Sequence, residues 1–397
     1  MSNESERPAL APGPLRVAMV GTRGVPARYG GFETCVEEVG RRLADRGHEV
    51  VVYCRTSSTK EPAAERPSSY LGMTLVHLPA LRRRSLETLS HTGLAVAHLS
   101  RHRADAAVVF NSANAPWLPV LRARGIPFAT HVDGLEWRRA KWDGLGRRYY
   151  RLAERLSVRW SDALIADARG IADYYREKYA AETSLITYGA PVVAPGNARL
   201  GEVGLQANAY HLVVARFEPE NHVREIVEGY VCSSAKLPLV VVGSAPYADE
   251  YTKQVHAAAD HRVRMLGAVW DQELLDQLYG NALSYLHGHS VGGTNPSLLR
   301  AIGAGTPTAA FDVVFNREVL GDSGRYFVHA QELADLIETA EADPDDLSKR
   351  SQQALERAAT YDWETVADGY EQLCRRLAGT SRHHLKTERI ARQGVRT

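Results

Sequence analysis

The stretch from His287 to Pro307, HGHSVGGTNPSLLRAIGAGTP, constrains the fold of this chain more than any other. An apolar run ends just before it, and Gly292 and Gly293 then lead into Asn295, a favoured N-cap residue, with Pro296 at the first helical position. The pattern predicts a buried strand, a glycine loop and the N-terminus of a helix. Free amides and the dipole at a helix start favour an anion. The stretch is therefore either a phosphate-binding loop or an ordinary connection in an α/β protein.

A second glycine loop stands near the start of the chain. Residues 15–20, LRVAMV, are expected to form a short buried strand, and GTRGVPARYGG follows, ending in Gly30 and Gly31. A helix and a second strand at 49–54 would complete a βαβ unit, which places the loop at the carboxyl end of the first strand, where open α/β sheets bind ligands. The loop lacks the GxGxxG pattern, so a nicotinamide cofactor is not supported.

Composition limits the broad class of protein. The chain has 397 residues, a net charge of +1 and four scattered cysteines. The charge argues against bulk nucleic-acid binding, and the cysteine spacing favours reduced thiols in a cytoplasmic protein over zinc ligands. No apolar run is long enough for a transmembrane helix. Residues 1–14 are acidic and proline-rich, and we expect them to be disordered and not a signal peptide.

The order of elements predicts two α/β domains. The first is expected at 15–190 and the second at 191–360, since the region from 189 to 209 is rich in Gly, Pro and Ala with little periodicity. A C-terminal helix is expected at 361–378 and a basic flexible tail at 379–397. Residues 311–315 are expected to be one more strand or extended turn.

A polar loop, HVDGLEWRRAKW, follows the strand expected at 127–130. It contains His131, Asp133 and Glu136 together with two tryptophans. Loops at strand ends carry function more often than cores do, and several titratable groups converge on this one strand end. The alternative is a solvated loop whose tryptophans pack locally.

These motifs support a resemblance to a known family. VGTRGVPARYGGFET, VDGLEWRRAKW, ARFEPEN and HGHSVGGTNPSL occur in order between about residues 15 and 378. The chain resembles glycosyltransferase family 4, and within it the rhamnosyltransferase-type branch. The resemblance implies an α/β fold of the GT-B type, with two Rossmann-like doubly wound domains that face each other across a cleft.

The resemblance also implies where substrates bind. A nucleotide-sugar donor would lie mainly on the C-terminal domain and an acceptor mainly on the N-terminal one. Donor-binding residues are then expected in both glycine loops and in ARFEPEN: Gly30, Gly31, Arg216, Asn221, Gly292, Gly293, Thr294, Asn295 and Arg300. Arg216 stands where the family has a diphosphate-binding arginine, which suits a guanidinium, and Asn221 stands where the wider family has a lysine.

Arg300 is the main departure from the family pattern. The wider family has two glutamates spaced eight apart, and this chain has Gly292 and Arg300 in their places. The second glutamate usually binds ribose hydroxyls, which an arginine cannot accept from. Four interpretations stay open: the donor is a deoxynucleotide sugar, Arg300 replaces the cation missing at 221, activity is reduced, or Arg300 is an ordinary surface residue.

Catalysis is expected to be retaining and independent of metal or any cofactor. His131 matches a histidine that lines the sugar site in related enzymes, and Asp133 and Glu136 could bind acceptor hydroxyls. The leaving phosphate itself would take the acceptor proton, so no side-chain nucleophile is required, and catalysis would depend on orientation and on stabilisation of the diphosphate. The branch implies dTDP-rhamnose as donor and a glycan or lipid-linked acceptor in cell-surface polysaccharide synthesis.

Other functions stay open at this point. They are a catalytically impaired nucleotide-sugar-binding subunit, a transferase that uses another hexose, and an epimerase or phosphorylase on the same fold. A basic helix is also expected around 147–159. Its arginines, with Arg82, Arg83 and Arg84, form either a solvated surface or a peripheral docking site for an anionic membrane on the cytoplasmic side; the helix arginines are Arg147, Arg148, Arg151, Arg155 and Arg159.

Overall fold

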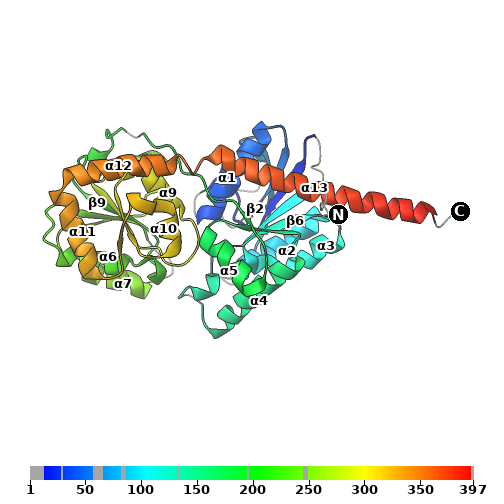
Figure 1. The fold of residues 1–397 in the computed structure, drawn as a ribbon, viewed down its shortest axis with the longest axis horizontal. Coiled ribbons are helices and arrows are strands. Elements are labelled where there is room, and N and C mark those ends of the chain that lie inside the picture. The colour runs from blue at the N-terminus through cyan, green and yellow to red at the C-terminus, as the bar shows by residue number, and fades with distance from the viewer. Residues whose placement is uncertain are drawn as a thin grey trace, which may run out of the picture.

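The computed structural model describes residues 13–27, 30–56, 66–81, 86–132, 134–140, 142–194, 196–244 and 249–394. Two sheets lie side by side, each covered by helices (Figure 1). Of the segment expected to be disordered, residues 1–14, the first twelve lie outside the described residues. Asp133 and the cluster of Arg82, Arg83 and Arg84 lie outside them too.

The N-terminal sheet has, in the described part of the chain, eight strands in the order β3-β4-β2-β1-β5-β6-β7-β8. Neighbouring strands are parallel except for β3 and β4, so the carboxyl ends of the central strands share one edge. The strands are β1 (Arg16–Val20), β2 (Glu49–Arg55), β3 (Ser69–Tyr70), β4 (Met73–Leu78), β5 (Ala106–Phe110), β6 (Phe128–His131), β7 (Ala163–Ala166) and β8 (Ser184–Leu185).

Helices cover both faces of this sheet. The first of them buries Cys35, Val36, Val39 and Leu43. These lie on one helical face, because Cys35, Val36 and Leu43 each stand three or four residues from Val39. The helices of this domain are α1 (Gly30–Asp45), α2 (Glu87–Leu99), α3 (Leu118–Ala123), α4 (Gly144–Trp160) and α5 (Arg169–Tyr179).

The C-terminal sheet is parallel, and among the described residues it has six strands in the order β11-β10-β9-β12-β13-β14. Its strands are β9 (His211–Val214), β10 (Leu239–Val242), β11 (Val263–Gly267), β12 (Ser284–His287), β13 (Thr308–Phe311) and β14 (Arg325–Phe327). Its helices are α6 (Val223–Cys232), α7 (Asp249–Ala258), α8 (Gln272–Gly280), α9 (Pro296–Gly303), α10 (Val314–Leu320), α11 (Ala330–Ala342) and α12 (Pro344–Ala358).

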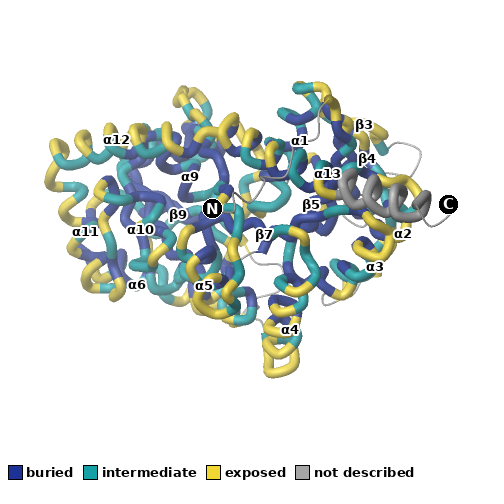
Figure 2. The backbone as a smooth tube through the Cα atoms, turned by 45° about the vertical axis from the view of Figure 1, so that its right-hand side comes forward, coloured by how far each residue is buried: buried dark blue, intermediate teal, exposed yellow. Residues whose placement is uncertain are grey.

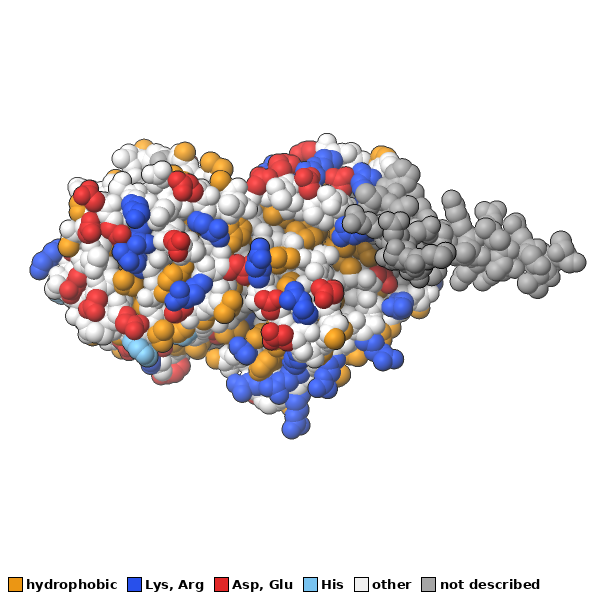
Figure 3. Space-filling model, in the orientation of Figure 1, with side chains coloured by type: hydrophobic (Ala, Val, Ile, Leu, Met, Phe, Trp, Pro, Cys, Tyr) orange, Lys and Arg blue, Asp and Glu red, His pale blue; other side chains and the backbone are white. Residues whose placement is uncertain are grey.

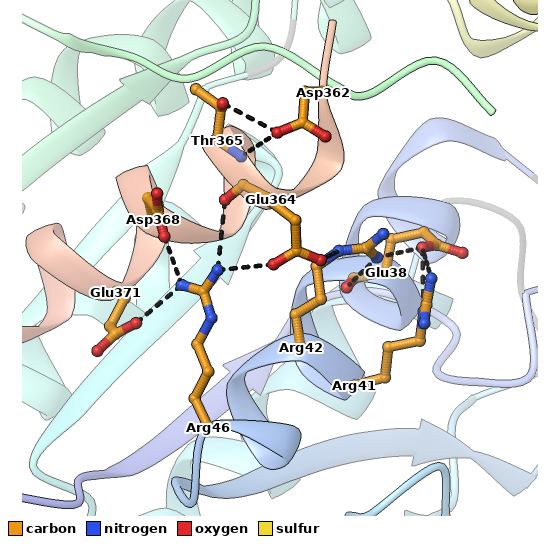
Figure 4. A network of polar contacts seen from close by, with 9 residues as sticks. All are labelled: Glu38, Arg41, Arg42, Arg46, Asp362, Glu364, Thr365, Asp368 and Glu371. Carbon is orange, nitrogen blue, oxygen red and sulfur yellow. Dashed lines mark hydrogen bonds and ion pairs between the residues drawn. The ribbon is translucent and has the colours of Figure 1, made fainter. Parts of the chain in front are cut away.

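The last helix, α13 (Trp363–Gly394), returns to the N-terminal domain and lies along α1 (Figure 1). Arg46 of α1 forms ion pairs with three α13 carboxylates, those of Glu364 at 2.8 Å, Asp368 at 2.7 Å and Glu371 at 2.9 Å (Figure 4). The Cys35 thiol lies 3.4 Å from the hydroxyl of Tyr370 in the buried part of this contact. The two domains are therefore joined by a helix as well as by a linker.

Two expectations from the sequence are wrong. The stretch 311–315, expected to be a strand or extended turn, is instead the end of β13, a two-residue connection and the start of α10 at Val314, because β13 takes up the apolar residues up to Phe311. The C-terminal helix does not stop at Ala378 but continues to Gly394, in place of the flexible tail. Gly379 weakens a helix at the expected end, but no proline follows it to stop one.

Burial separates the two cores from an exposed projection. The central strands of both sheets are buried, whereas the tip of α4 is exposed (Figure 2). Lys and Arg side chains gather over α4 in the space-filling view (Figure 3). A search of the described helices finds none with the length and apolar character needed to cross a bilayer.

Candidate functional site

The loops at the carboxyl ends of the two sheets touch each other, and we call this contact the seam. A Cβ atom added to Gly31 would lie 3.1 Å from the Pro296 ring, and one on Gly134 would lie 2.2 Å from the Cα of Gly292. One on Gly293 would lie 2.0 Å from Asp167 Oδ1. Real Cβ atoms essentially never approach other atoms as closely as at Gly134 and Gly293, and the contact at Gly31 would be tight, so the domains come together as they do because these positions lack side chains.

The predicted strand, glycine loop and helix start are confirmed at β12 and α9. The Asn295 side chain accepts a hydrogen bond from the Ser297 amide at 2.8 Å, and Pro296 is the first helical residue. Gly292 has a φ of +152°, a conformation that a residue with a side chain rarely adopts. The loop therefore leads into a capped helix N-terminus at the seam.

Arg216 and Asn221 lie beside this loop on the same domain. Arg216 follows β9 and is exposed, and in the described part of the chain it has no ion-pair partner. The Asn221 amide donates to the Arg216 carbonyl at 2.8 Å, and its Oδ1 accepts from His289 Nδ1 at 2.8 Å. Asn221 thus connects the loops after β9 and β12, with its side-chain amide nitrogen bound to one loop and its amide oxygen bound to the other.

His131 does not lie in a loop as expected, because it is the last residue of β6 and is fully buried. Its ring centroid lies 5.0 Å from that of Phe32, 5.5 Å from Phe110 and 6.0 Å from Tyr188. Burial lowers the pKa of His131 to about 3, so the imidazole is neutral at physiological pH. His131 therefore packs within an aromatic cluster, which the sequence did not indicate. Its catalytic role stays a prediction.

Glu136 lies at the same domain edge but already has partners. Its carboxylate accepts from Trp142 Nε1 at 3.2 Å and pairs with the guanidinium of Arg139. Its side chain is only 8% exposed, so an acceptor hydroxyl could reach it only by sharing or displacing these contacts. Asp133, predicted beside it, lies outside the described residues.

Arg139 also crosses the seam. Its Nη1 lies 3.5 Å from Glu220 Oε1 of the C-terminal domain, in the short 3₁₀ helix Pro219–Asn221. Although part of Arg216 is exposed, surrounding protein atoms lower its pKa, and the nearby positive charge of Arg139 lowers it further. Two guanidiniums from different domains therefore lie close enough to repel each other.

Arg300 points toward α8. Its Nε lies 3.1 Å from Asp276 Oδ1, and its Nη2 donates to Gln272 Oε1 at 2.7 Å. These contacts give Arg300 a structural partner within its own domain. Its part in donor binding, whether toward phosphate or ribose, stays a prediction.

Three residues of the seam were missed from sequence: Arg139, Asp167 and His289. Asp167 directly follows β7, and this position after a buried strand was a signal that could have identified it. It is 4% exposed, its Oδ1 has no hydrogen-bond partner in the described structure, and burial raises its pKa to about 7. In the ranges that the structure covers, no three His, Cys, Asp or Glu side chains are placed to hold a metal ion.

Comparisons with known proteins agree with this architecture. Two family models match consecutive parts of the chain: the glycosyl transferase 4-like domain over residues 30–189 and the glycosyl transferases group 1 domain over residues 205–358. D-inositol 3-phosphate glycosyltransferase of Stackebrandtia nassauensis is 37% identical over 84 residues, which are 20% of this chain and 18% of that protein.

Solved structures match over nearly the whole chain. Sucrose-phosphate synthase from Thermosynechococcus elongatus has a TM-score of 0.79 at 20% identity, covering 91% of this chain and 98% of that one. Anabaena HepE, solved with UDP-glucose, has a TM-score of 0.72 at 16% identity, covering 89% and 97%. These likenesses confirm the predicted fold, which is α/β with two Rossmann-like domains of the GT-B type.

Proposed function

Because the chain belongs to the group 1 glycosyltransferases of family 4, we propose that it transfers a sugar from a nucleotide-diphosphate donor to a glycan or lipid-linked acceptor. One observation carries this proposal: Arg216 lies close to the capped N-terminus of α9. The two are linked through Asn221 and His289, whose ring nitrogen lies next to Gly292. A guanidinium and free helix amides suit a diphosphate.

In this proposal the donor lies along the seam. Arg216 and the amides from Gly292 to Asn295 hold its diphosphate, and Gly30 and Gly31 approach it from the other domain. His131 and Glu136 lie on the acceptor side, where they would line the sugar and acceptor hydroxyls. The seam must open for the donor to enter, since the glycine contacts leave no room between the loops.

The reaction we propose is retaining and requires no metal or side-chain nucleophile. The leaving diphosphate oxygen accepts the proton of the attacking hydroxyl on the same face of the sugar. Arg216 and the helix amides stabilise the charge that develops on that oxygen.

Rhamnose, carried by dTDP, is the donor sugar that we propose. Support comes from the four sequence motifs and from Arg300, which cannot accept hydrogen bonds from ribose hydroxyls. A donor that lacks the ribose 2′-hydroxyl needs that contact least. Anabaena HepE was solved with UDP-glucose, so another hexose donor is the alternative, and an impaired binding subunit is a second one.

We also propose that the N-terminal domain docks on the inner face of an anionic membrane through α4. Leu145 is 75% exposed and Leu152 51% exposed on this helix. Exposed arginines accompany them: Arg147, Arg148, Arg151, Arg155 and Arg159. Basic and apolar side chains together favour an anionic lipid surface, which suits a lipid-linked acceptor.

Calorimetry with nucleotides tests the proposed donor site. Wild-type protein should bind dTDP and UDP, and Arg216→Ala should weaken binding by about 1.5–3 kcal/mol, the range for a charged hydrogen bond. Arg224→Ala, in the same domain but paired with Glu228 at 3.4 Å, is the control and should bind as wild type does. Turnover of dTDP-rhamnose or UDP-glucose then separates an enzyme from a binding subunit. A wild-type protein that binds no nucleotide would refute the proposed function.

A further inference from the structure

A chain of three charged residues crosses the seam. Glu136 and Arg139 come from the N-terminal domain, and Glu220 comes from the C-terminal one. Their side chains are 8%, 16% and 4% exposed. Buried charges are retained at such positions only when they are paired, and here two carboxylates share one guanidinium.

Glu220 is incompletely satisfied in this arrangement. Its Oε1 lies 3.5 Å from Arg139 Nη1, a long contact, and its buried Oε2 has no hydrogen-bond partner in the described structure. A buried carboxylate oxygen without a partner is costly, so the ion pair is poorly optimised as a permanent contact. Arg139 is therefore paired closely with Glu136 on its own domain and more weakly with Glu220 across the seam.

The weaker partner lies beside the expected diphosphate site. Glu220 is the residue before Asn221, whose amide donates to the carbonyl of Arg216. Arg139 and Arg216 therefore border the same short 3₁₀ helix from different domains, and their like charges repel, since the charge of Arg139 lowers the pKa of Arg216. An anion between them would relieve that repulsion.

We infer that Arg139 is a second cation for the donor diphosphate, supplied by the N-terminal domain, and that it exchanges Glu220 for phosphate when the donor binds. This inference rests on the proposed function and adds a residue to its site. It supplies a cation at the place where Asn221 offers none. Arg300, considered for that role from the sequence, is instead paired with Asp276 on α8.

The exchange gives two variants opposite effects. Arg139→Ala removes a phosphate ligand and should weaken diphosphate binding. Glu220→Gln removes the competitor for Arg139 and a negative charge beside the donor, so it should strengthen binding. If Arg139 and Glu220 only fasten the domains together, both variants break the same contact and must change binding in the same direction.

Calorimetry with dTDP and dTMP distinguishes these outcomes, with circular dichroism to verify folding. We expect Arg139→Ala to lower dTDP affinity at least ten-fold and dTMP affinity less, Arg139→Lys to retain part of the binding, and Glu220→Gln to raise dTDP affinity several-fold. Arg138→Ala is the matched control, because Arg138 is exposed and stacks 5.3 Å from the Trp137 ring.

Two results would overturn the inference while leaving the proposed function in place. One is unchanged dTDP affinity in Arg139→Ala when Arg216→Ala loses affinity. The other is a change of dTDP affinity in the same direction in Arg139→Ala and Glu220→Gln. Failure of the wild type to bind any nucleotide would instead refute the proposed function, so the two failures are distinct.

Discussion

The hydroxyl of Thr294 donates a 2.6 Å hydrogen bond to the main-chain oxygen of Asp167, joining the α9 loop of one domain to the end of β7 in the other. Both residues are buried. The neighbouring Gly293 lies against the carboxyl group of the same Asp167. The loop expected to bind the donor is thus fastened directly to the N-terminal domain.

Gly293→Ala should force the seam open. Its new Cβ would lie 2.0 Å from Asp167 Oδ1, and relieving such a clash typically costs about 1–3 kcal/mol. We expect a larger radius of gyration by small-angle X-ray scattering and at least ten-fold lower turnover. Gly201→Ala is the control, since nothing lies within 4 Å of the position its Cβ would take. Unchanged scattering and turnover in Gly293→Ala would contradict this account of the seam.

Asp167→Asn should stabilise the protein more at high pH than at low pH. Burial, with a smaller contribution from Glu318, raises the pKa of Asp167 to about 7, against a hydrogen bond from Tyr188 that lowers it. Between about pH 4 and 7 the folded state keeps a proton on Asp167 that the unfolded state releases, so the contribution of Asp167 to wild-type stability falls by about 1.4 kcal/mol per pH unit as the pH rises.

The asparagine amide does not titrate, so the substitution removes this loss of stability at high pH. The difference in melting temperature between Asp167→Asn and wild type should therefore grow from pH 5 to pH 8. A difference that does not change with pH would show that the carboxyl group is already ionised in the folded protein.

Buried histidines should make the protein labile to acid. Burial lowers the pKa of His131 and His287 to about 3 and that of His91 to about 4, the last also through Arg55. Below about pH 6.5 the unfolded chain gains protons that the folded protein does not, so each of the three removes about 1.4 kcal/mol of stability per pH unit as the pH falls.

Chemical denaturation at pH 7.5, 6 and 5 measures this slope, the change in the free energy of unfolding per pH unit. His131→Phe should reduce the slope, since phenylalanine suits the aromatic surroundings and does not titrate, and it should lower turnover more than donor affinity. His261→Gln, at an exposed position, should leave both unchanged. If His131→Phe changes neither the slope nor turnover, the buried neutral state and the catalytic role are both wrong.

Arg300→Glu should destabilise the C-terminal domain by about 1 kcal/mol, because it replaces a partly exposed ion pair with repulsion from Asp276. Arg300→Glu combined with Asp276→Arg should recover the stability. Titration with UDP and dTDP tests the ribose hypothesis in the same variant. A gain in affinity for UDP alone would support a lost ribose contact. A loss of affinity for both nucleotides would support a phosphate contact.

Vesicle flotation measures the proposed docking of α4. Binding should rise with anionic lipid and fall with salt, and Arg147, Arg151 and Arg155 changed together to Glu should abolish it, since each basic residue contributes roughly 1 kcal/mol. A matched charge reversal at Arg101, Arg103 and Arg124, which are exposed elsewhere on this domain, should have a smaller effect. Equal binding to neutral and anionic vesicles would argue against this surface.

Local patterns in the sequence predicted the elements that depend on near neighbours. The strands expected at 15–20, 49–54 and 127–130 are observed as β1, β2 and β6 with each end within one residue, since short buried runs between turn residues leave few alternatives. The pairing of Arg139 with Glu220 could not be predicted in this way, because it depends on how two domains face each other. His131 was placed in a loop for a related reason, since its aromatic neighbours are distant in sequence.

The two crossings between the domains have a mechanical consequence. The Ala190 amide of the linker donates to the Tyr361 carbonyl just before α13 at 2.7 Å, and Gly189 packs against Trp363. The chain therefore passes between the domains twice at nearly the same point. We expect that point to stay fixed while the seam swings apart by rotation about it. A single proteolytic cut in either crossing would leave the domains tethered by the other.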